Sequence, residues 1–376
     1  MTSIAHHSRT TATPAACELE TFDELESLQS EWTPLAEQSG NVFATWEWMS
    51  VWHRHFAHDR PLLVAACRTD GQLRAVVALY LFSERPLRIA RLVGHGAADE
   101  LGAIAAPADA AFGAWALDRA LAEAPWRWQV FLAEDVPAGS ALAGSLSAGT
   151  LIAGTVNPVL RAPAGGWEAY LASRSANFRQ QVRRRERNLA RAHRVDYRLC
   201  DDPDRLEADL DALFALHAAR WGDDSVFGGL AAFHREFAAV ALARGWLRLW
   251  LLELDGRAAA AWYGFRFAGV ESYYQAGWDP AFQESSVGFV LLGHSIREAL
   301  EDGMTEYRFL RGDEAYKSRF ADEDRRLETI ALSRTLVGRA AIAAEAATRR
   351  RPGMRRAAAA ARSRLTSISG RLEARR

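Results

Sequence analysis

One lysine stands alone among the basic side chains of this 376-residue chain. Of 46 lysines and arginines, only Lys317 is a lysine, and it ends the segment FLRGDEAYK at residues 309–317. A compact ammonium on a flexible stem makes contacts that a planar guanidinium cannot make. Lys317 is therefore predicted to touch a ligand. The alternative is that an arginine-rich composition has left one lysine by chance.

A second candidate is the segment SSVG at residues 285–288, which lies between a strand-like run and a helix expected to begin near Gly288. The first N–H groups of a helix and the positive end of its dipole bind anions. Ser285, Ser286, Val287 and Gly288 are therefore predicted to form an anion site. The alternative is that Ser285 or Ser286 only caps the helix.

A third candidate is the arginine-rich segment NFRQQVRRRER at residues 177–187. Arg179, Arg183 and Arg187 fall four residues apart and share one face of a helix. Because arginine forks bind phosphate through two hydrogen bonds, Arg179 and Arg183 are candidates for donor binding. The alternative is an ordinary solvated face.

The spacing of the remaining polar residues favours direct transfer over a covalent intermediate. The sequence has no Ser-His-Asp order and no reactive cysteine setting. A direct transfer needs only positioning, a proton acceptor and a proton donor to the leaving group. Asp313 or Glu314 is predicted to accept the proton, and one of three tyrosines to protonate the leaving group: Tyr273, Tyr274 and Tyr316.

Two stretches of similar element order must position these residues. The first, residues 17–160, begins with a helix capped by Thr21, with Glu24 completing a capping box. An aromatic helix at 46–56 follows. Alternating patterns then predict strands at 62–67, 75–82, 87–93, 128–132 and up to 160, and helices at 112–122 and 137–148.

The second stretch, residues 161–334, contains a clear antiparallel meander. Strands are expected at 195–200, 246–254, 258–267, 270–278, 307–310 and 327–333, with Asp255-Gly256 as a hairpin turn. Helices are expected at 167–173, 176–192, 203–221, 230–243, 288–301 and around Tyr316. This order predicts an α/β (α+β) protein in which two related units each carry a mixed sheet flanked by helices.

Several segments together resemble the CelD-like acyltransferases of the GNAT superfamily, whose tandem fold is related to that of the FemAB peptidyltransferases. They are NFRQQVRRRER at 177–187, LHAARW at 216–221, residues 274–288, residues 309–320 and FATWEW at 43–48. The resemblance covers residues 17–333. It implies two tandem GNAT domains, at 17–160 and 161–334, and acyl transfer from acyl-CoA, acetyl-CoA being the usual one, to an amine without a metal.

The resemblance implies that the donor pyrophosphate rests on residues 285–288. The residues themselves, and not the resemblance, make Lys317, Tyr316, Asp313 and Tyr274 the candidates for catalysis, and the sequence alone singles out none of them. The turn departs from the superfamily pattern, since it has Glu284 and a single glycine. Acyl-CoA, an acyl carrier and aminoacyl-tRNA therefore all stay open as donors. The rival functions are a FemAB-like peptidyltransferase and a scaffold of a polysaccharide synthesis assembly, and the acceptor is expected to be a small molecule or glycan precursor of the cell envelope.

The ends of the chain differ from its body in composition. Residues 334–376 contain 12 arginines and two glutamates, although the whole chain has a net charge of -1. This basic tail, residues 335–376, is expected to contact an anionic membrane or nucleic acid. Residues 1–16 are expected to be disordered, and no apolar run is long enough for a transmembrane segment. Cys17, Cys67 and Cys200 show no pairing pattern, which favours a reducing cytoplasm, at the inner face of the membrane if the tail binds there.

Overall fold

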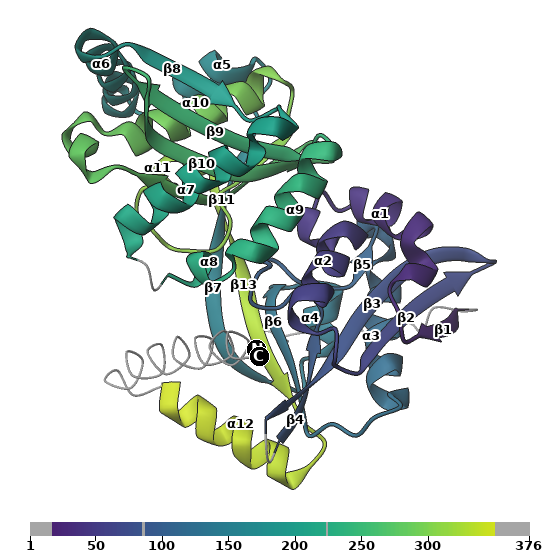
Figure 1. The fold of residues 1–376 in the computed structure, drawn as a ribbon. Helices are drawn as coiled ribbons and strands as arrows, with labels where there is room; N and C mark the ends of the chain where they lie inside the picture. Colours follow the sequence, from purple (N-terminus) through teal and green to yellow (C-terminus); the bar gives the residue numbers. More distant parts are fainter. Residues whose placement is uncertain (1–16, 85–86, 223–224, 350–376) are drawn as a thin grey trace, which may run out of the picture.

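The computed structural model describes residues 17–84, 87–222 and 225–349 (Figure 1). Its strands join into one continuous sheet in the order β1-β2-β3-β4-β6-β13-β7-β12-β11-β10-β9-β8, with β5 pairing with β3. The two predicted units are present as the two halves of this sheet. Each half has a meander of antiparallel strands and one parallel pair, β4 with β6 and β11 with β12.

The N-terminal half agrees with the sequence prediction except at its start. Thr21 does not cap a helix, because it lies in β1 and pairs with Ala65 of β2. Extended pairing at the sheet edge therefore overrides the local capping signal. The elements of this half are β1 (Glu18–Phe22), α1 (Gln29–Glu37), α2 (Trp46–Phe56), β2 (Leu62–Thr69), β3 (Gln72–Glu84), β4 (Leu87–Leu92), β5 (Ile104–Ala105), α3 (Ala110–Glu123), β6 (Val130–Pro137), α4 (Ala141–Ser145) and β7 (Thr150–Arg161).

The C-terminal half follows the predicted order closely. Its meander of β9, β10 and β11 has the Asp255-Gly256 turn, where both residues have positive φ. Its elements are α5 (Gly166–Ser173), α6 (Ala176–Ala192), β8 (Val195–Leu199), α7 (Leu206–Trp221), α8 (Val226–Gly229), α9 (Ala231–Ala243), β9 (Leu247–Leu254), β10 (Arg257–Phe267), β11 (Val270–Trp278), α10 (Val287–Glu301), β12 (Glu306–Arg308), α11 (Lys317–Phe320) and β13 (Glu323–Leu332).

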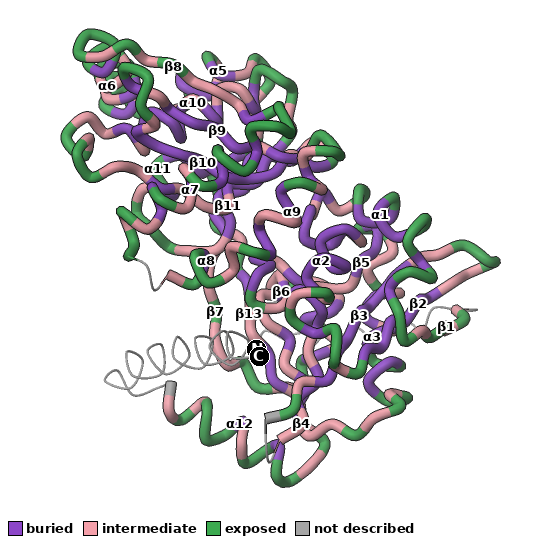
Figure 2. The backbone as a smooth tube through the Cα atoms, viewed as in Figure 1, coloured by how far each residue is buried: buried purple, intermediate pink, exposed green. Residues whose placement is uncertain are grey.

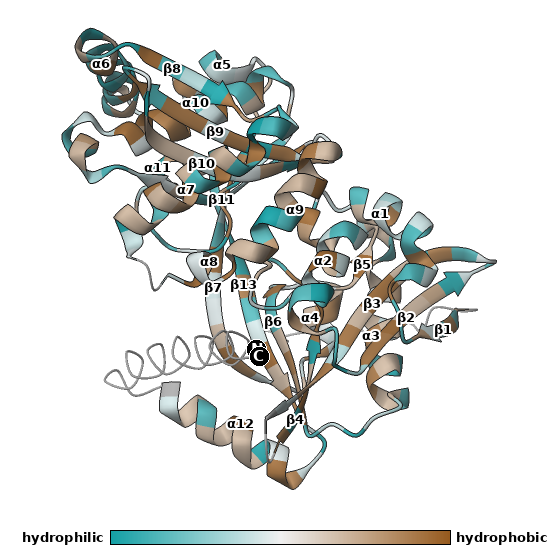
Figure 3. Cartoon of the chain, in the orientation of Figure 1, coloured by the Kyte–Doolittle hydropathy of each residue, from teal (hydrophilic) through white to brown (hydrophobic). Residues whose placement is uncertain are grey.

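Two large apolar cores lie on opposite faces of the C-terminal sheet. One contains the buried side chains of α5, α6 and α10 with Trp262 and Tyr273. The other contains α7 and α9 with Tyr263 and Phe265, and it continues into the N-terminal half through Trp48 of α2. The buried strands and the mixed exposure of the helices are visible in Figure 2, and the apolar strands and the hydrophilic α6 in Figure 3. The two halves are thus joined by side-chain packing as well as by the sheet.

Strand β13 is shared between the two halves. It belongs to the C-terminal half in sequence, yet it pairs with β6 and with β7 of the N-terminal half. The predicted boundary at residues 160/161 follows the order of elements along the chain, whereas the hydrogen bonds of β13 cross it.

The basic segment that was expected to be an independent tail begins with a packed helix. In α12 (Leu336–Arg349), Ile342 is buried against Ile89 and Val130. The rest of the expected tail, residues 350–376, and the expected disordered residues 1–16 lie outside the described residues. In the described ranges, no helix is both long enough and apolar enough to span a bilayer.

The expectation of no disulfide is wrong for one pair. Cys17 and Cys67 form a disulfide although they are 50 residues apart in sequence. Cys67 lies in β2 opposite Leu19 of β1, so pairing of these strands brings the two thiols together. Sequence spacing does not reveal this pair because the pairing of β1 was not predicted. Cys200 is buried and free.

Candidate active site

The candidate site lies where two neighbouring strands separate. Strand β11 runs from Val270 to Trp278, but it pairs with β12 only over its first three residues, Val270 to Ser272. Beyond Ser272, β11 has no pairing with β12, while it stays paired with β10 through Trp278. Tyr273, Ala276 and Trp278 of this second half of β11 line a cavity.

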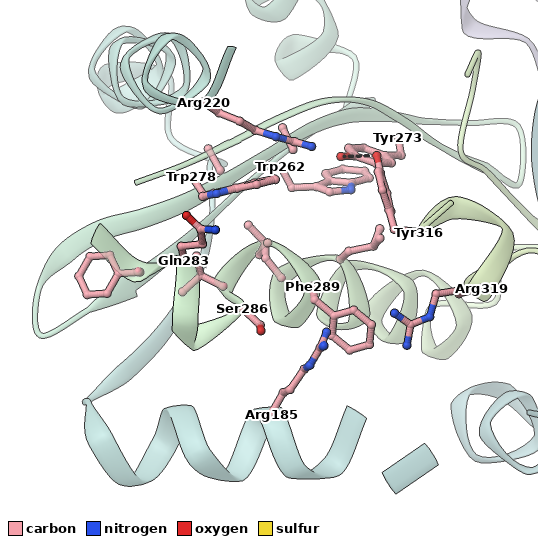
Figure 4. Close-up of a pocket in the computed structure, with 17 residues that line it drawn as sticks. Arg185, Arg220, Trp262, Tyr273, Trp278, Gln283, Ser286, Phe289, Tyr316 and Arg319 are labelled. Atoms are coloured by element: carbon pink, nitrogen blue, oxygen red, sulfur yellow. Dashed lines mark hydrogen bonds between the residues drawn. The ribbon is translucent and has the colours of Figure 1, made fainter. Parts of the chain in front are cut away.

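This cavity has a volume of about 270 Å³ and lies between β10, β11 and helix α10 (Figure 4). Its walls are mostly aromatic and aliphatic, with three arginines among them. The lining residues are Arg185, Arg220, Ala261, Trp262, Tyr273, Ala276, Trp278, Phe282, Gln283, Ser286, Val287, Gly288, Phe289, Leu291, Leu292, Tyr316 and Arg319. An apolar cavity with a few convergent polar groups is the usual form of a small-molecule site.

The N-terminus of α10 forms one wall. Ser286 has a left-handed backbone (φ 55°) and follows the helical turn that ends at Ser285, so the chain passes from right-handed to left-handed geometry. Successive N–H groups in this geometry form a concavity that binds anions. Ser286, Val287 and Gly288 line the cavity, whereas Ser285 is not among its lining residues. That this turn holds phosphates stays a prediction.

Gly288 is needed because an indole ring lies directly on it. A Cβ atom at position 288 would lie 2.9 Å from the Trp278 ring. Trp278 therefore packs flat over the start of α10 and closes that side of the cavity. The helix dipole and the unpaired first amides of α10 make this wall positive.

The arginines at this end are not those predicted from sequence. Arg185 lines the cavity with its guanidinium carbon 4.2 Å from the centre of the Phe289 ring. Arg319 also lines it and donates to Gln181 (2.5 Å). Burial lowers the pKa of Arg185, and the adjacent charges of Arg319 and Arg184 lower it further. An anion between the two guanidinium groups would relieve this repulsion.

Arg179 and Arg183, the predicted phosphate ligands, lie outside the cavity. Arg179 donates to the carbonyl of Arg174 (2.5 Å), and Arg183 is exposed with Glu168 at 3.9 Å. Arg185 instead shares the buried face of α6, whose core residues are Phe178, Val182 and Leu189. The spacing of these apolar residues would have indicated Arg185, because a charged residue on an apolar face needs a partner.

Two tyrosines form the opposite end of the cavity. The Tyr316 hydroxyl donates to the Tyr273 hydroxyl (3.2 Å), and the Tyr273 ring stacks on Trp262. Burial raises the pKa of both phenols. Both hydroxyls therefore keep their protons at neutral pH, and the Tyr273 proton is free to point at a ligand.

The turn that carries Tyr316 is held by Lys317. Its ammonium is buried, donates to the carbonyl of Arg311 (2.8 Å) and pairs with Glu314 (2.9 Å). Gly312 (φ 131°) lies under this pair, since a Cβ there would be 2.3 Å from the Glu314 carboxylate. Lys317 is not among the cavity-lining residues, so its contact with a ligand stays a prediction.

Arg311 connects the same turn to the N-terminal half. Its guanidinium pairs with Asp135 of β6 (2.5 Å) and with Asp99 (3.1 Å). Burial raises the pKa of Asp135 to about 6, and the Arg311 charge opposes this rise. The two carboxylates thus fix the 311–317 turn relative to the N-terminal half.

Two other predicted site residues lie away from the cavity. Tyr274 points to the opposite face of β11, where its hydroxyl donates to the carbonyl of Ala97 (2.7 Å). Asp313 is exposed on the turn. In the LHAARW segment, His217 is buried on α7, and its backbone lies against Gly277, where a Cβ would be 2.3 Å from the His217 nitrogen. Adjacent residues on a strand face opposite sides, which separates Tyr273 from Tyr274.

The comparison with protein families agrees with this geometry. Residues 176–318 match the family described as an acetyltransferase (GNAT) domain. Residues 176–318 form a GNAT domain. The matched residues include α6, the divergent strands β11 and β12, the α10 N-terminus and Lys317, that is, most of the cavity wall.

Solved structures extend the GNAT fold over nearly the whole chain. The crystal structure of FemX has 12% identity and a TM-score of 0.59, covering 82% of this chain and 96% of its own. A domain attributed to a lysylphosphatidylglycerol synthetase of Agrobacterium fabrum has 11% identity and a TM-score of 0.55, covering 86% and 97%. The L-PGS of Bacillus licheniformis has 12% identity and a TM-score of 0.51, covering 85% and 94%. At these identities the likeness concerns the fold, which is the tandem, FemAB-related one. A search of curated proteins finds no match.

Proposed function

We propose that this GNAT protein is an N-acyltransferase that moves an acyl group from acyl-CoA to an amine. The observation that carries the proposal is the positive wall of the cavity: the Ser286 turn, the α10 N-terminus, Arg185 and Arg319 converge at one end. This end suits the phosphates of the donor. The aromatic walls suit the pantetheine arm, and the thioester reaches Tyr273 and Tyr316.

The chemical step needs no covalent enzyme intermediate. The amine nitrogen attacks the thioester carbonyl carbon, the C–S bond breaks, and the CoA thiolate leaves. The Tyr273–Tyr316 pair, which its raised pKa values keep protonated, donates a hydrogen bond to the leaving thiolate, and the thiolate takes a proton from water on release. The ammonium proton of the acceptor passes to a carboxylate of the turn, for which Glu314 is better placed than Asp313. Glu314 is close enough to add to the rise in the Tyr316 pKa, which burial dominates.

The second candidate donor is aminoacyl-tRNA. The observation in its favour is the exposed face of α6, where Arg183, Arg184 and Arg187 extend the positive charge beyond the cavity. Such a face suits a phosphate backbone. The resemblance to the FemAB peptidyltransferases, whose fold FemX shares with this chain, makes tRNA a necessary arm of the test.

The test is calorimetric binding of CoA, acetyl-CoA and unfractionated tRNA to the wild-type protein and two arginine variants. Arg185→Ala is expected to weaken CoA binding about tenfold, because it removes a charge-assisted hydrogen bond. Arg183→Ala on the same helix is the matched control and should leave CoA binding unchanged.

The outcomes separate the candidates. CoA binding that depends on Arg185 supports acyl-CoA as donor. Binding of tRNA that is lost in Arg183→Ala, with no binding of CoA, supports the aminoacyl donor. If the protein binds neither CoA nor tRNA, both donor candidates are contradicted, and a scaffold function is favoured. The proposal also includes an envelope precursor as acceptor and contact of residues 335–376 with an anionic surface. The Cys17–Cys67 disulfide removes the cysteine argument for a cytoplasmic location, which stays a prediction.

A further inference from the structure

We infer that Arg220 forms a carboxylate-binding subsite at the tyrosine end of the cavity, separate from the phosphate end. The carboxylate belongs either to the amine acceptor, as in an amino acid, or to the acyl group, as in a malonyl or succinyl donor. The inference rests on the proposed function, since it names a substrate class for the same cavity.

Arg220 reaches the cavity from the other side of the sheet. It ends α7, which packs on the face of β10 and β11 opposite to α10. Its guanidinium extends over Trp278 toward the hydroxyl of Tyr273, whereas Arg185 and Arg319 lie on the α10 side (Figure 4). The cavity therefore has a cation at each end.

The guanidinium of Arg220 is covered on its flat surface. Its central carbon lies 3.5 Å from the centre of the Trp278 ring and 4.2 Å from that of Trp221. Stacking of this kind leaves the edge of the guanidinium, with its N–H groups, as the part open to a ligand. A planar carboxylate can meet that edge with two parallel hydrogen bonds.

The surroundings of Arg220 favour one negative charge. Burial lowers the pKa of Arg220, and its hydrogen bond to Tyr273 and the nearby charge of Glu314 oppose this only in part. The N–H groups of Arg220 that do not face Tyr273 are therefore the ones left for a ligand. Among residues 17–84, 87–222 and 225–349, which exclude Asp223 and Asp224, no carboxylate forms an ion pair with it. A single cation beside two neutral hydroxyls suits a monoanion, whereas the other end combines two arginines with a helix dipole.

Matched pairs of compounds that differ in one carboxylate test the subsite. The melting temperature is measured with amino acids and their carboxamides (glycine, β-alanine and phenylalanine against their amides) in the presence of saturating CoA. A second arm compares malonyl-CoA and succinyl-CoA with acetyl-CoA. Both arms use wild type, Arg220→Gln, Arg220→Lys and, as a control at the other end of α7, the exposed Arg205→Gln.

We expect the wild type to bind the carboxylate member of a pair about tenfold more tightly than its neutral partner, the size of one charge-assisted contact. Arg220→Gln should abolish this preference, Arg220→Lys should retain part of it, and Arg205→Gln should keep all of it. A preference in the first arm assigns the carboxylate to the acceptor, and one in the second arm to the donor.

Three results would overturn the subsite: no preference for a carboxylate in either arm, no stabilisation by any of these compounds, or a preference that survives in Arg220→Gln. Stabilisation by CoA itself is read in the same runs. If CoA stabilises the protein without any carboxylate preference, the subsite fails and the proposed function stands. If CoA does not stabilise it, the proposed donor fails.

Discussion

At the scale of single residues, some polar side chains line the cavity and others hold the cavity-lining turn in place. Arg185, Arg220, Tyr273 and Tyr316 line the cavity. Lys317, predicted from its rarity, lies behind them and holds the carbonyls of Leu310 and Arg311. A buried ammonium with several acceptors cannot be replaced without leaving those carbonyls unsatisfied.

We therefore expect Lys317→Met to reduce turnover at least about tenfold, which equals about 1.4 kcal/mol of transition-state stabilisation. It should also lower the free energy of unfolding by about 1–3 kcal/mol, because the carbonyl of Arg311 loses its partner. Steady-state kinetics and urea unfolding measure the two effects. If the variant keeps wild-type turnover and stability, Lys317 neither contacts a ligand nor holds the turn through the carbonyl of Arg311.

Asp135 predicts a pH dependence of stability. Its pKa is raised by burial to about 6 in the folded protein, from an ordinary value of about 3.8. Between these pH values the folded state retains a proton that the unfolded state has lost, so stability falls as the pH rises. The wild type should therefore lose stability relative to Asp135→Asn between about pH 4 and pH 6. Urea unfolding across this range tests it, and a constant difference between the two proteins would show that Asp135 titrates normally.

At the scale of elements, the start of α10 depends on the close approach of strand β11. The ring of Trp278 would be 2.9 Å from a Cβ at Gly288, whereas nothing lies within 4 Å of one at Gly293 on the same helix. Gly288→Val should displace Trp278 and raise the KM for the donor about tenfold or more, because the phosphate turn and the cavity wall both move.

Gly293→Ala is the matched control for Gly288→Val. It adds a methyl group to the same helix in open space, and it should leave the KM unchanged while stabilising α10 by up to about 1 kcal/mol. Circular dichroism of both variants checks that the fold is intact. If Gly288→Val binds CoA as tightly as the wild type, the phosphate site is not at this turn.

At the scale of the whole molecule, the shared strand and the continuous core join the two halves. Because β13 lies between β6 and β7, and the core runs from α2 to α9, neither half is complete alone. We expect a single calorimetric unfolding transition for the full chain and an insoluble fragment 17–160. Two separate transitions would instead support the predicted boundary as a division between independent domains.

The basic C-terminal segment predicts a salt-dependent surface interaction. Each arginine near an anionic lipid surface contributes about 1 kcal/mol, and salt screens this within a Debye length. The full chain should sediment with phosphatidylglycerol vesicles at low salt but not with phosphatidylcholine vesicles. A chain ending at Arg349 should lose this binding and stay folded, since it keeps Ile342 in its contact with Val130.

A chain ending at Ser333 should, in addition, be less stable, because it exposes the apolar surface that α12 covers. Equal sedimentation of all three chains, or binding that salt does not change, would contradict the interaction.

The sequence by itself determined most elements and the general place of the site. Periodicity located the β9–β11 meander and α10, because alternation and the 3.6-residue repeat are local properties of buried faces. The SSVG turn at residues 285–288 was also identified from a local signal, namely small residues between a strand and the start of a helix. The predicted likeness to the GNAT superfamily rested on the same segments, and the family match confirms it for residues 176–318.

Only the tertiary structure decided which polar residues meet. Arg185, rather than Arg179 or Arg183, lines the cavity because the orientation of α6 is set by packing against α10. Arg220 arrives from the opposite side of the sheet, and the Cys17–Cys67 disulfide depends on strand pairing across 50 residues. β13 likewise enters the far half of the sheet. Each of these contacts joins segments distant in sequence, so no local sequence pattern specifies the contact. The contacts form because folding buries apolar faces against one another and so brings these segments together.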